Sequence, residues 1–241
     1  MLNIGSGPRT NREWNNLDFS PYARLAWHKS LTRFLNAVGL LSDFRYDNLR
    51  KIDPEIIHWD VYNGLPFHDN VFDFVYHSHF ITHIDRDAAF FITKECHRIL
   101  KSGGIVRVVV PDLEQIVNLY NEAMADLDAA RPRGNEKHSE AVDELFELMV
   151  RKSAWGTSRE SFLVRIIERL FRGNIEKTGE LRRWHYDRHS MGGMLADAGF
   201  REVSIMTPNS SDFEGWDPSG LDLEEDGSVY KPGSLYMEGT K

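Results

Sequence analysis

The chain has 241 residues, with 29 Lys and Arg against 37 Asp and Glu, and therefore a formal net charge of −8 at pH 7. This acidic balance argues against a nucleic-acid partner, which requires a basic surface to meet phosphates. The single cysteine, Cys96, excludes a disulfide framework and a Cys-rich metal site. With 41% hydrophobic and 27% charged residues, the composition is that of a globular protein able to bury a full core.

Two further absences bear on localisation. The sequence holds no run of about 18 apolar residues, so we expect no membrane span. The first seven residues lack the basic and apolar regions of a secretory signal peptide. Together with the single cysteine, these features predict a cytoplasmic protein.

The first half of the chain alternates between strand and helix patterns. Strands are predicted at residues 1–4, 14–18, 56–61, 72–76 and 105–110, and helices at 27–38 and 85–100. We expect Asp85 or Asp87 to cap the second helix and Gly103-Gly104 to end it. The run Ile105–Val110 lacks alternation, which is typical of a strand covered on both faces. This order predicts βαβ units in a parallel sheet.

After Pro111 the pattern becomes helical for about 75 residues. Apolar stripes over 142–149 and 162–171 predict helices, a further helix is expected at 190–198, and two late strands at 203–206 and 235–237. We expect the acidic segment 210–227 to be mobile. The whole chain, 1–241, is predicted to be a single domain with a helical cap insertion at about 113–189, over the carboxyl ends of the strands.

Residues suited to ligand binding follow the predicted strands. The turn Gly5-Ser6-Gly7 follows the first strand, Asp18 the second and Asp60 the third. In parallel sheets, ligands bind beyond the carboxyl ends, at the point where strand order reverses. Glycines allow close approach of the backbone, and carboxylates can accept ribose hydroxyls and an adenine amine. The order of these residues predicts a nucleoside-containing cofactor.

Each of these signals has a simpler interpretation when taken singly. A Gly-x-Gly sequence is more often an ordinary turn, and an Asp after a strand is usually a helix cap. A nicotinamide-dependent dehydrogenase is disfavoured, because Thr10 replaces the third glycine of its motif and the spacing to the acid is shorter than about 20 residues. A P-loop is excluded because the sequence contains no Gly-Lys-Ser/Thr.

Several histidines form another candidate group. His77, His79 and His83 follow the fourth strand, and His185 precedes the late helix. The pair His79 and His83 has zincin spacing but lacks the usual glutamate, so we expect no metal. These histidines either bond backbone groups at strand ends or serve as a general base. Asp112 fits a helix cap better than a ligand contact.

Four motifs resemble those of class I S-adenosylmethionine-dependent methyltransferases. The stretch Leu2–Gly7 resembles the first motif of that family, Leu65–Asp73 its "LPF-x-D-x-x-F-D" stretch, His97–Gly104 its "R-x-L-K-P-G-G" turn, and Ala198–Phe200 its "AGF". The resemblance covers roughly residues 1–112 and 184–239. Two further stretches, Val110–Glu114 and Lys231–Tyr236, resemble a type 11-like subgroup found in bacterial glycan or secondary-metabolite pathways.

This resemblance implies a Rossmann-like α/β sheet, mostly parallel with helices on both faces, and S-adenosylmethionine as cofactor. The residues that it assigns to cofactor binding are Asn3, Gly5, Ser6, Gly7, Asp18, Asp60, Val61 and His77. We expect O-methylation of a small-molecule, sugar or glycan hydroxyl. The catalytic base is expected to be His79, with His83 as the nearest substitute. The acceptor is expected to contact His185, Tyr186 and Asp112. Two alternatives stay open: N-methylation of a small molecule or peptide, and a non-catalytic cofactor-binding partner subunit.

The sequence also departs from the family pattern. Asn3 stands where the family usually has an acid, Ser102 replaces a proline, and no third glycine occurs near Arg9. Only 11 residues separate Gly7 from Asp18, so we expect the first helix to be very short or absent. The chain begins inside the first motif, so either the family's upstream helix is missing or the natural start lies upstream.

Overall fold

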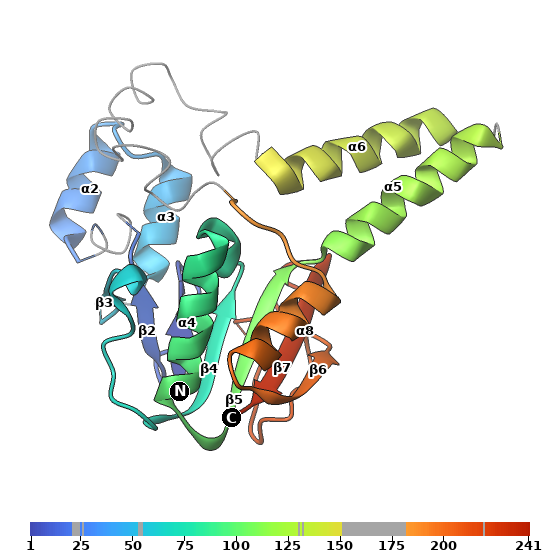
Figure 1. Cartoon of the computed structure of the whole chain (residues 1–241). Helices are drawn as coiled ribbons and strands as arrows, with labels where there is room; N and C mark the ends of the chain where they lie inside the picture. Colours follow the sequence, from blue (N-terminus) through green and yellow to red (C-terminus); the bar gives the residue numbers. More distant parts are fainter. Residues whose placement is uncertain are drawn as a thin grey trace.

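A computed structural model describes residues 1–20, 25, 27–52, 55–129, 131, 133–150, 182–218 and 220–241. The described residues form a seven-stranded sheet in the order β3-β2-β1-β4-β5-β7-β6 (Figure 1). All neighbouring strands pair in parallel except β7, which is antiparallel to β5 and β6. The strands are β1 Leu2–Ile4, β2 Asn15–Asp18, β3 Ile57–His58, β4 Phe72–Ser78, β5 Leu100–Pro111, β6 Arg201–Met206 and β7 Ser234–Thr240.

The strand order reverses between β1 and β4. From β1 the chain proceeds outward through β2 and β3, and it then crosses over to β4 and β5 on the other side of β1. In doubly wound sheets, this reversal opens a crevice at the carboxyl ends of the two central strands. The prediction of a Rossmann-like, mostly parallel sheet is confirmed, and the strand-order reversal lies where the Gly5-Ser6-Gly7 turn follows β1.

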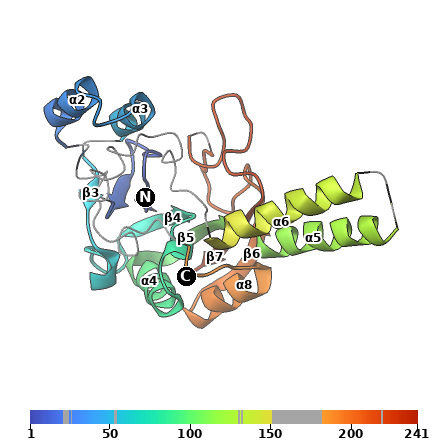
Figure 2. The same ribbon diagram turned by 90° about the horizontal axis from the view of Figure 1, so that it is seen from above.

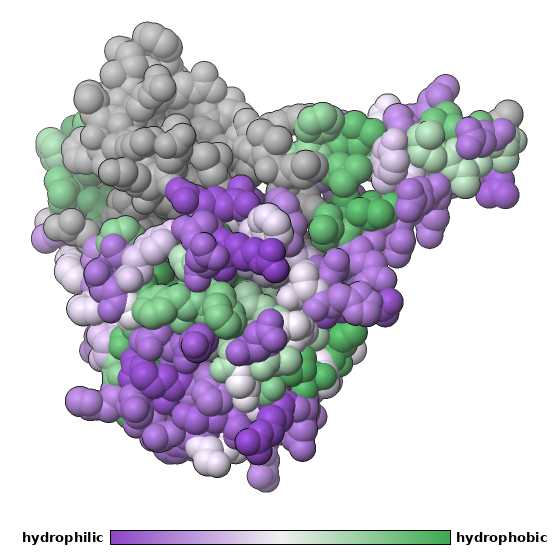
Figure 3. Space-filling model, viewed as in Figure 1, coloured by the Kyte–Doolittle hydropathy of each residue, from purple (hydrophilic) through white to green (hydrophobic). Residues whose placement is uncertain are grey.

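Helices lie on both sides of the sheet (Figures 1 and 2). One face is covered by α4 and α8, while α2 and α3 lie beside β3 on the other side. An antiparallel hairpin of α5 and α6 projects from the end of β5, and apolar atoms gather near its base (Figure 3). The helices are α2 Lys29–Ala37, α3 Asp43–Lys51, η1 Val61–Asn63, η2 Ile81–His83, α4 Arg86–Ile99, α5 Leu113–Asp128, α6 Gly134–Val150 and α8 Arg188–Asp197. The predicted stripe over 162–171 lies outside the described residues.

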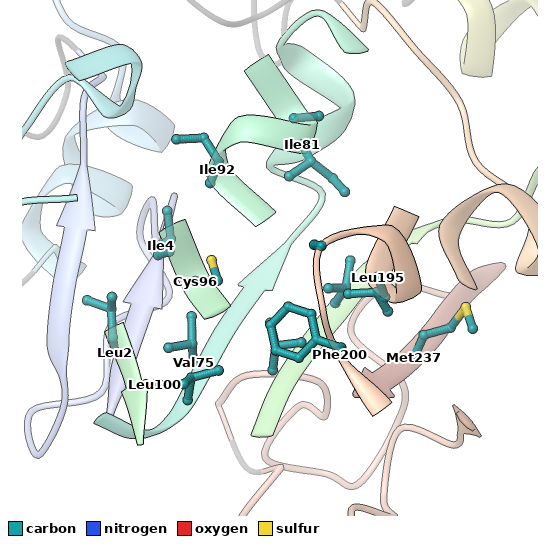
Figure 4. Packing of buried hydrophobic residues seen from close by; sticks show 14 of the residues in the cluster. Leu2, Ile4, Val75, Ile81, Ile92, Cys96, Leu100, Leu195, Phe200 and Met237 are labelled. Atoms are coloured by element: carbon teal, nitrogen blue, oxygen red, sulfur yellow. The ribbon is translucent and has the colours of Figure 1, made fainter. Parts of the chain in front are cut away.

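The main core lies between the sheet and the helices α4 and α8 (Figure 4). Ile4 and Val75 from the strands meet Ile92 from α4 and Leu195 from α8, and all four are inaccessible to solvent. Full burial of each such side chain contributes about 1.5–3 kcal/mol. This packing holds β1 against β4, and so fixes the two strands that frame the crevice.

Helix α4 begins as predicted but ends earlier. Asp85 is its N-cap, and its carboxylate accepts a hydrogen bond from Ala88 N at 2.9 Å. The helix ends at Ile99 and β5 starts directly at Leu100, so the expectation that Gly103-Gly104 ends the helix is wrong. Phe72 pairs with Leu100 whereas Phe74 pairs with Ile105. The two glycines therefore belong to a bulge that lets β5 rejoin β4 in register.

Helix α2 forms within the predicted range, but most of its apolar side chains are exposed to solvent. Leu31, Phe34 and Val38 are 44%, 60% and 49% exposed. Leu35 packs against the cluster around α3. Because α2 packs against a small cluster around α3 and not against the sheet, one narrow face satisfies its contacts.

The segment 207–233 covers the sheet opposite α4 and α8, over β4, β5 and β7 (Figure 2). Its anchor is Arg107 of β5, whose side chain is wholly buried. The Arg107 guanidinium donates to Asp222 Oδ2 at 2.9 Å and to Glu238 Oε1 at 2.7 Å. It also donates to the carbonyl oxygens of Ser210 and Thr207, both at 2.8 Å. The expectation that this acidic segment is mobile is wrong, because these bonds tie it to the sheet.

An aromatic cluster completes the same layer. Trp14, Phe74 and Trp216 contact one another, with ring centroids 5.4–6.3 Å apart. The Arg107 guanidinium lies 4.6 Å from the Trp216 ring centroid, within the range of a cation–π interaction. Asp222 is held from its second oxygen by Tyr76 Oη, which donates at 2.6 Å. Segment 207–233 thus provides the apolar cover and counter-charges of this face.

Replacing Arg107 is expected to destabilise the fold strongly. Arg107→Met leaves Asp222 and Glu238 as buried carboxylates without their cation, which typically costs about 3–5 kcal/mol. Urea unfolding at pH 7.5 measures this loss. Lys101→Met is the matched control in the same strand, because its pair with Asp73 is exposed and worth about 0–1 kcal/mol.

The deficit of the Arg107 variant is also expected to shrink as the pH falls. Burial raises the pKa of Asp222 above its ordinary value even with Arg107 present, and removing the cation raises it further. The folded variant then binds protons that the unfolded chain does not, so its stability rises toward acid. A deficit below 1 kcal/mol at pH 7.5 would contradict the anchoring role of Arg107.

Candidate functional site

The glycine turn after β1 is packed on one side and open on the other. Gly5 and Gly7 have φ angles of +66° and +52°, a conformation that glycine adopts without strain. Gly5 N donates to Leu17 O at 2.7 Å, which binds the turn to the end of β2. A Cβ at Gly5 would lie 2.7 Å from Phe80 Cδ2, whereas a Cβ at Gly7 would meet nothing within 4 Å. The turn therefore offers an open backbone surface at Gly7.

Asp18 stands at the end of β2 with its carboxylate directed at this turn. Its Oδ2 accepts a hydrogen bond from Gly7 N at 2.8 Å, and its Oδ1 accepts one from Ser20 N at 2.6 Å. A carboxylate offers about four lone-pair sites, so two further donors can be accommodated. Asp18 thus orders the turn and still has the acceptor capacity that a pair of ribose hydroxyls requires.

Asn3 holds the turn from beneath. Its buried amide Nδ2 donates to Arg9 O at 2.9 Å and lies 3.4 Å from Asn16 Oδ1. Asn16 Nδ2 in turn donates to Asn11 O at 2.8 Å. Residues 5–14, all described, contain no helix, as the short spacing predicted. Buried side-chain amides replace helical packing there, so any effect of Asn3 on a cofactor acts through the turn.

Asp60 and Val61 lie at the end of the neighbouring strand β3. Asp60 is the N-cap of η1, and its Oδ1 accepts a hydrogen bond from Tyr62 N at 3.0 Å, while Val61 is buried. Phe19 directly follows Asp18 in the sequence and is 47% exposed, with its ring centroid 5.4 Å from that of His58 in β3. Sequence analysis missed Phe19, although its position directly after the β2 acid is the signal that identifies it.

Two buried polar side chains near the crevice have no hydrogen-bond partner among the described residues. Both ring nitrogens of His77, at the end of β4, are unpartnered, as is Ser6 Oγ in the glycine turn. His77 is only 1% exposed, and burial lowers its pKa to about 4. Buried polar atoms in native proteins are almost always paired, so orphans on both sides of the β1–β4 reversal fit a bound polar ligand or water.

His79 has an unusual backbone conformation at the point where β4 leaves the sheet. Its φ is +53°, which is uncommon outside glycine and concentrates at functional sites. Its amide donates to Val109 O at 2.8 Å, and its Nε2 lies 2.8 Å from Ser234 Oγ at the start of β7. His83 lies in η2, one turn further along, and its amide donates to Phe80 O at 3.0 Å.

The predicted acceptor residues lie beyond β5. Asp112 caps α5, with Oδ1 accepting hydrogen bonds from Glu114 N and Gln115 N at 3.0 and 3.4 Å, so the cap interpretation is confirmed. Tyr186 forms a bridge with Asp112, and burial raises the pKa of its hydroxyl, which has no partner in the described parts of the chain, to about 12. Burial lowers the pKa of His185, with a smaller contribution from Arg182.

The structure thus gathers only part of the predicted set. The glycine turn, Asp18, His77 and His79 meet at the β1–β4 reversal, with Asp60 and Val61 at the next strand. His185 and Tyr186 lie further along the same edge, where Arg183 N donates to Thr82 O of η2 at 2.7 Å.

Sequence analysis also missed the segment that enters β7. Lys231 Nζ donates to Ser78 Oγ at 2.9 Å, next to the contact of Ser234 with His79. Tyr230 stacks on Arg9, whose guanidinium lies 3.7 Å from the ring centroid. The stretch Lys231–Tyr236 resembles a family motif, but its residue pattern does not predict that it packs against β4.

Neither a metal cluster nor a membrane helix is found in the part of the chain that the structure describes. No group of three His, Cys, Asp or Glu side chains there is arranged to hold a metal ion. No helix there is long and apolar enough to cross a bilayer.

Comparison with known proteins adds a family match. Residues 17–108 match the family model described as a methyltransferase domain, and no curated protein matches the chain. A Thermotoga maritima methyltransferase, described as a possible histamine N-methyltransferase, is 19% identical with a TM-score of 0.42, covering 100% of this chain and 81% of that one. An Archaeoglobus fulgidus methyltransferase is 12% identical with a TM-score of 0.45, and the match covers 100% of this chain and 85% of that one. A putative O-methyltransferase from Nostoc punctiforme is 12% identical with a TM-score of 0.44, and the match covers 100% of this chain and 51% of that one.

The family match covers part of the sheet. The matched residues run from the end of β2 into β5, and so include β4 at the strand-order reversal. This part of the chain is similar to a methyltransferase domain. The similarities to solved structures are too weak to extend that match to the rest of the chain.

Acid is expected to destabilise the protein through His77. Its pKa is about 4 in the folded state, against 6.5 as its ordinary value, so below pH 6.5 only the unfolded chain binds this proton. Stability contributed by the neutral ring is complete above pH 6.5 and falls by about 3 kcal/mol as the pH drops to 4. Unfolding free energies of His77→Leu between pH 7.5 and 4.5 should show a shallower decline than wild type.

The exposed His68 offers a matched control for this titration. We expect His68→Gln to follow the wild-type pH profile. Identical slopes for wild type and His77→Leu would contradict the burial of a neutral His77.

Proposed function

We propose that this protein is an S-adenosylmethionine-dependent methyltransferase that methylates a hydroxyl group of a small molecule, a sugar or a glycan. The observation that carries the proposal is His79, a histidine in a left-handed conformation at the end of β4, the strand adjacent to the glycine turn. S-adenosylmethionine supplies an already activated methyl group. The protein therefore has to align the acceptor and remove its proton, and a hydroxyl gains from a positioned base because its proton is weakly acidic.

The chain has suitable side chains for the cofactor at the β1–β4 crevice. The open surface at Gly7 suits close backbone contact, and the remaining lone pairs of Asp18 suit ribose hydroxyls. Asp60 has a second oxygen for an adenine amine, and Phe19 offers an exposed ring beside His58. The remaining assigned residues are Asn3, Gly5, Ser6, Val61 and His77. Of these, Ser6 and His77 carry the orphaned polar atoms.

The proposed base is His79, because a histidine side chain can accept a proton close to neutrality. His83 lies one turn later in η2, and His185 comes from the segment beyond the helical insertion. His185 and Tyr186 are proposed to bond acceptor hydroxyls, with Asp112 at the same place in the fold. In this arrangement residues 113–189 form a cap that shapes the acceptor site.

Asp18→Ala is expected to weaken S-adenosylmethionine binding by about 2–3 kcal/mol, the loss typical of a charge-assisted pair of hydrogen bonds. Isothermal calorimetry with the full chain measures it. Asp18→Asn separates two effects, because it keeps an acceptor for the turn but removes the charge. Unchanged affinity in Asp18→Ala would remove Asp18 from the site, and micromolar binding of NAD in the same titration would favour a dehydrogenase.

The base assignment is tested by three single variants. His79→Ala is expected to lower turnover by about 10²–10⁴ with little change in melting temperature, since a positioned base contributes about that factor. His83→Ala and His185→Ala are the matched variants, assayed on the acceptor that a hydroxyl-compound screen identifies. Near-full turnover in His79→Ala would shift the role to one of the other two. Near-full turnover in all three would favour an amine acceptor, and binding without turnover on any acceptor would favour a non-catalytic partner subunit.

A further inference from the structure

We propose that Arg9 is a positioning residue that holds the glycine turn in its cofactor-binding shape by attaching it to a hairpin at residues 222–230. This inference rests on the proposed function, because it takes Gly5-Ser6-Gly7 as part of the S-adenosylmethionine site. The carrying observation is that the Arg9 side chain forms an ion pair with Glu224, 215 residues away, and stacks on Tyr230. These two contacts are termed the Arg9 latch.

The backbone of Arg9 is bonded to the turn itself. Arg9 N donates a hydrogen bond to Ser6 O at 3.0 Å, and Arg9 O accepts one from Asn3 Nδ2 at 2.9 Å. A displacement of Arg9 therefore disturbs the turn at Ser6 and its support by Asn3. Residues 5–14 contain no helix that would hold their conformation, so the turn depends on bonds to neighbouring segments.

The hairpin that receives the guanidinium is itself held in place. Glu224 N donates to Ser228 O at 2.8 Å, and Tyr230 N donates to Asp222 O at 2.9 Å. Asp222 is 2% exposed and pairs with the buried Arg107 of β5. Both residues of the hairpin that form the latch are thus fixed relative to the sheet. The latch connects the glycine turn to the same anchor.

The latch combines two contacts of different kinds. The Arg9 guanidinium carbon lies 3.7 Å from the Tyr230 ring centroid, within the range of a cation–π interaction. The side chains of Arg9 and Glu224 are 27% and 41% exposed, so water screens their pair less than it screens a fully exposed one. Because a guanidinium is planar, it can stack through its face and donate through its edge at the same time. The two contacts together favour one position of Arg9.

A positioning role and a direct contact with the cofactor predict opposite effects of Glu224. If Arg9 bound the cofactor directly, removing Glu224 would free the positive charge of Arg9, and affinity would stay the same or rise. If Arg9 acts through the turn, removing either partner releases the turn and weakens binding. By thermodynamic linkage, bound cofactor then strengthens the latch by the same factor as the latch strengthens binding.

The first experiment measures amide hydrogen exchange at Gly5 and Gly7 by NMR, in the full chain without cofactor. Both amides donate to residues of β2, so their exchange reports the order of the turn. We expect Arg9→Met and Glu224→Ala to accelerate this exchange by about 3–10-fold, the factor typical of losing a partly exposed ion pair or a cation–π contact. Amides of β4 serve as the internal reference and should be unchanged.

Glu225→Ala is the matched control for Glu224→Ala. Glu225 is the next residue of the same hairpin, is exposed, and has no ion pair within the described part of the chain. Its removal takes away the same charge and leaves the latch intact. We therefore expect wild-type exchange at the glycine turn in this variant. Melting curves verify that each variant is folded.

The second experiment titrates S-adenosylmethionine into each variant by calorimetry. We expect Arg9→Met, Glu224→Ala and Tyr230→Leu to weaken binding by about 3–10-fold, and Glu225→Ala to bind as wild type does. The double variant Arg9→Met with Glu224→Ala should lose less than the product of the two single losses, because both remove one interaction. In wild type, bound cofactor should slow exchange of the Tyr230 amide, and in Arg9→Met it should not.

Wild-type exchange at Gly5 and Gly7 in folded Arg9→Met would overturn the proposal, as would equal effects of Glu224→Ala and Glu225→Ala. Weaker binding in Arg9→Met with unchanged or tighter binding in Glu224→Ala would show a direct contact in place of a positioning role. Absence of S-adenosylmethionine binding in wild type would overturn the proposed function instead. The exchange comparison decides in that case whether Arg9 orders the turn.

Discussion

The arrangement of the functional edge depends on one buried guanidinium. Burying the charge of Arg107 costs several kcal/mol unless it is fully paired, and two carboxylates and two carbonyl oxygens pair it. Asp222 belongs to the segment 207–233 and Glu238 to β7, so a single side chain sets the position of both. Ser234 lies where that segment joins β7, and it contacts His79 at the end of β4.

A second constraint is the short connection between β1 and β2. A full helix would pair its own backbone N–H and C=O groups. Residues 5–14 contain no helix, so their backbone groups need other hydrogen-bond partners. Asn3 and Asn16 do so from below, and the Asp18 carboxylate does so from the side through Gly7. The residue proposed to bind the ribose is thus also the residue that shapes the turn. In this proposal, cofactor binding and the order of the turn are coupled through one carboxylate.

The sequence predicted what short-range patterns encode. Strand cores, the Asp85 and Asp112 caps, and the placement of Gly5, Asp18 and Asp60 after successive strands all depend on neighbours within a few residues. It failed where partners are distant: Arg107 lies 115 residues from Asp222 and 131 from Glu238, so segment 210–227 looked like a mobile acidic loop. The exposure of the apolar side chains of α2 could not be predicted for a related reason. Periodicity identifies an apolar stripe on a helix, but it does not show whether another element packs against that stripe.

The two histidines at the end of β4 illustrate how one strand can supply two different environments. Local pattern places His77 and His79 together, and only the backbone conformation separates them. His77 continues the strand into a solvent-free site, where burial lowers its pKa to about 4 and keeps it neutral. A ring held neutral in this way can offer hydrogen bonds to a ligand but is a poor proton acceptor near pH 7. His79 leaves the sheet through its left-handed φ and is only partly buried beside a hydroxyl. The proposed division of roles, with His77 as a neutral cofactor contact and His79 as the base, therefore follows from one backbone angle.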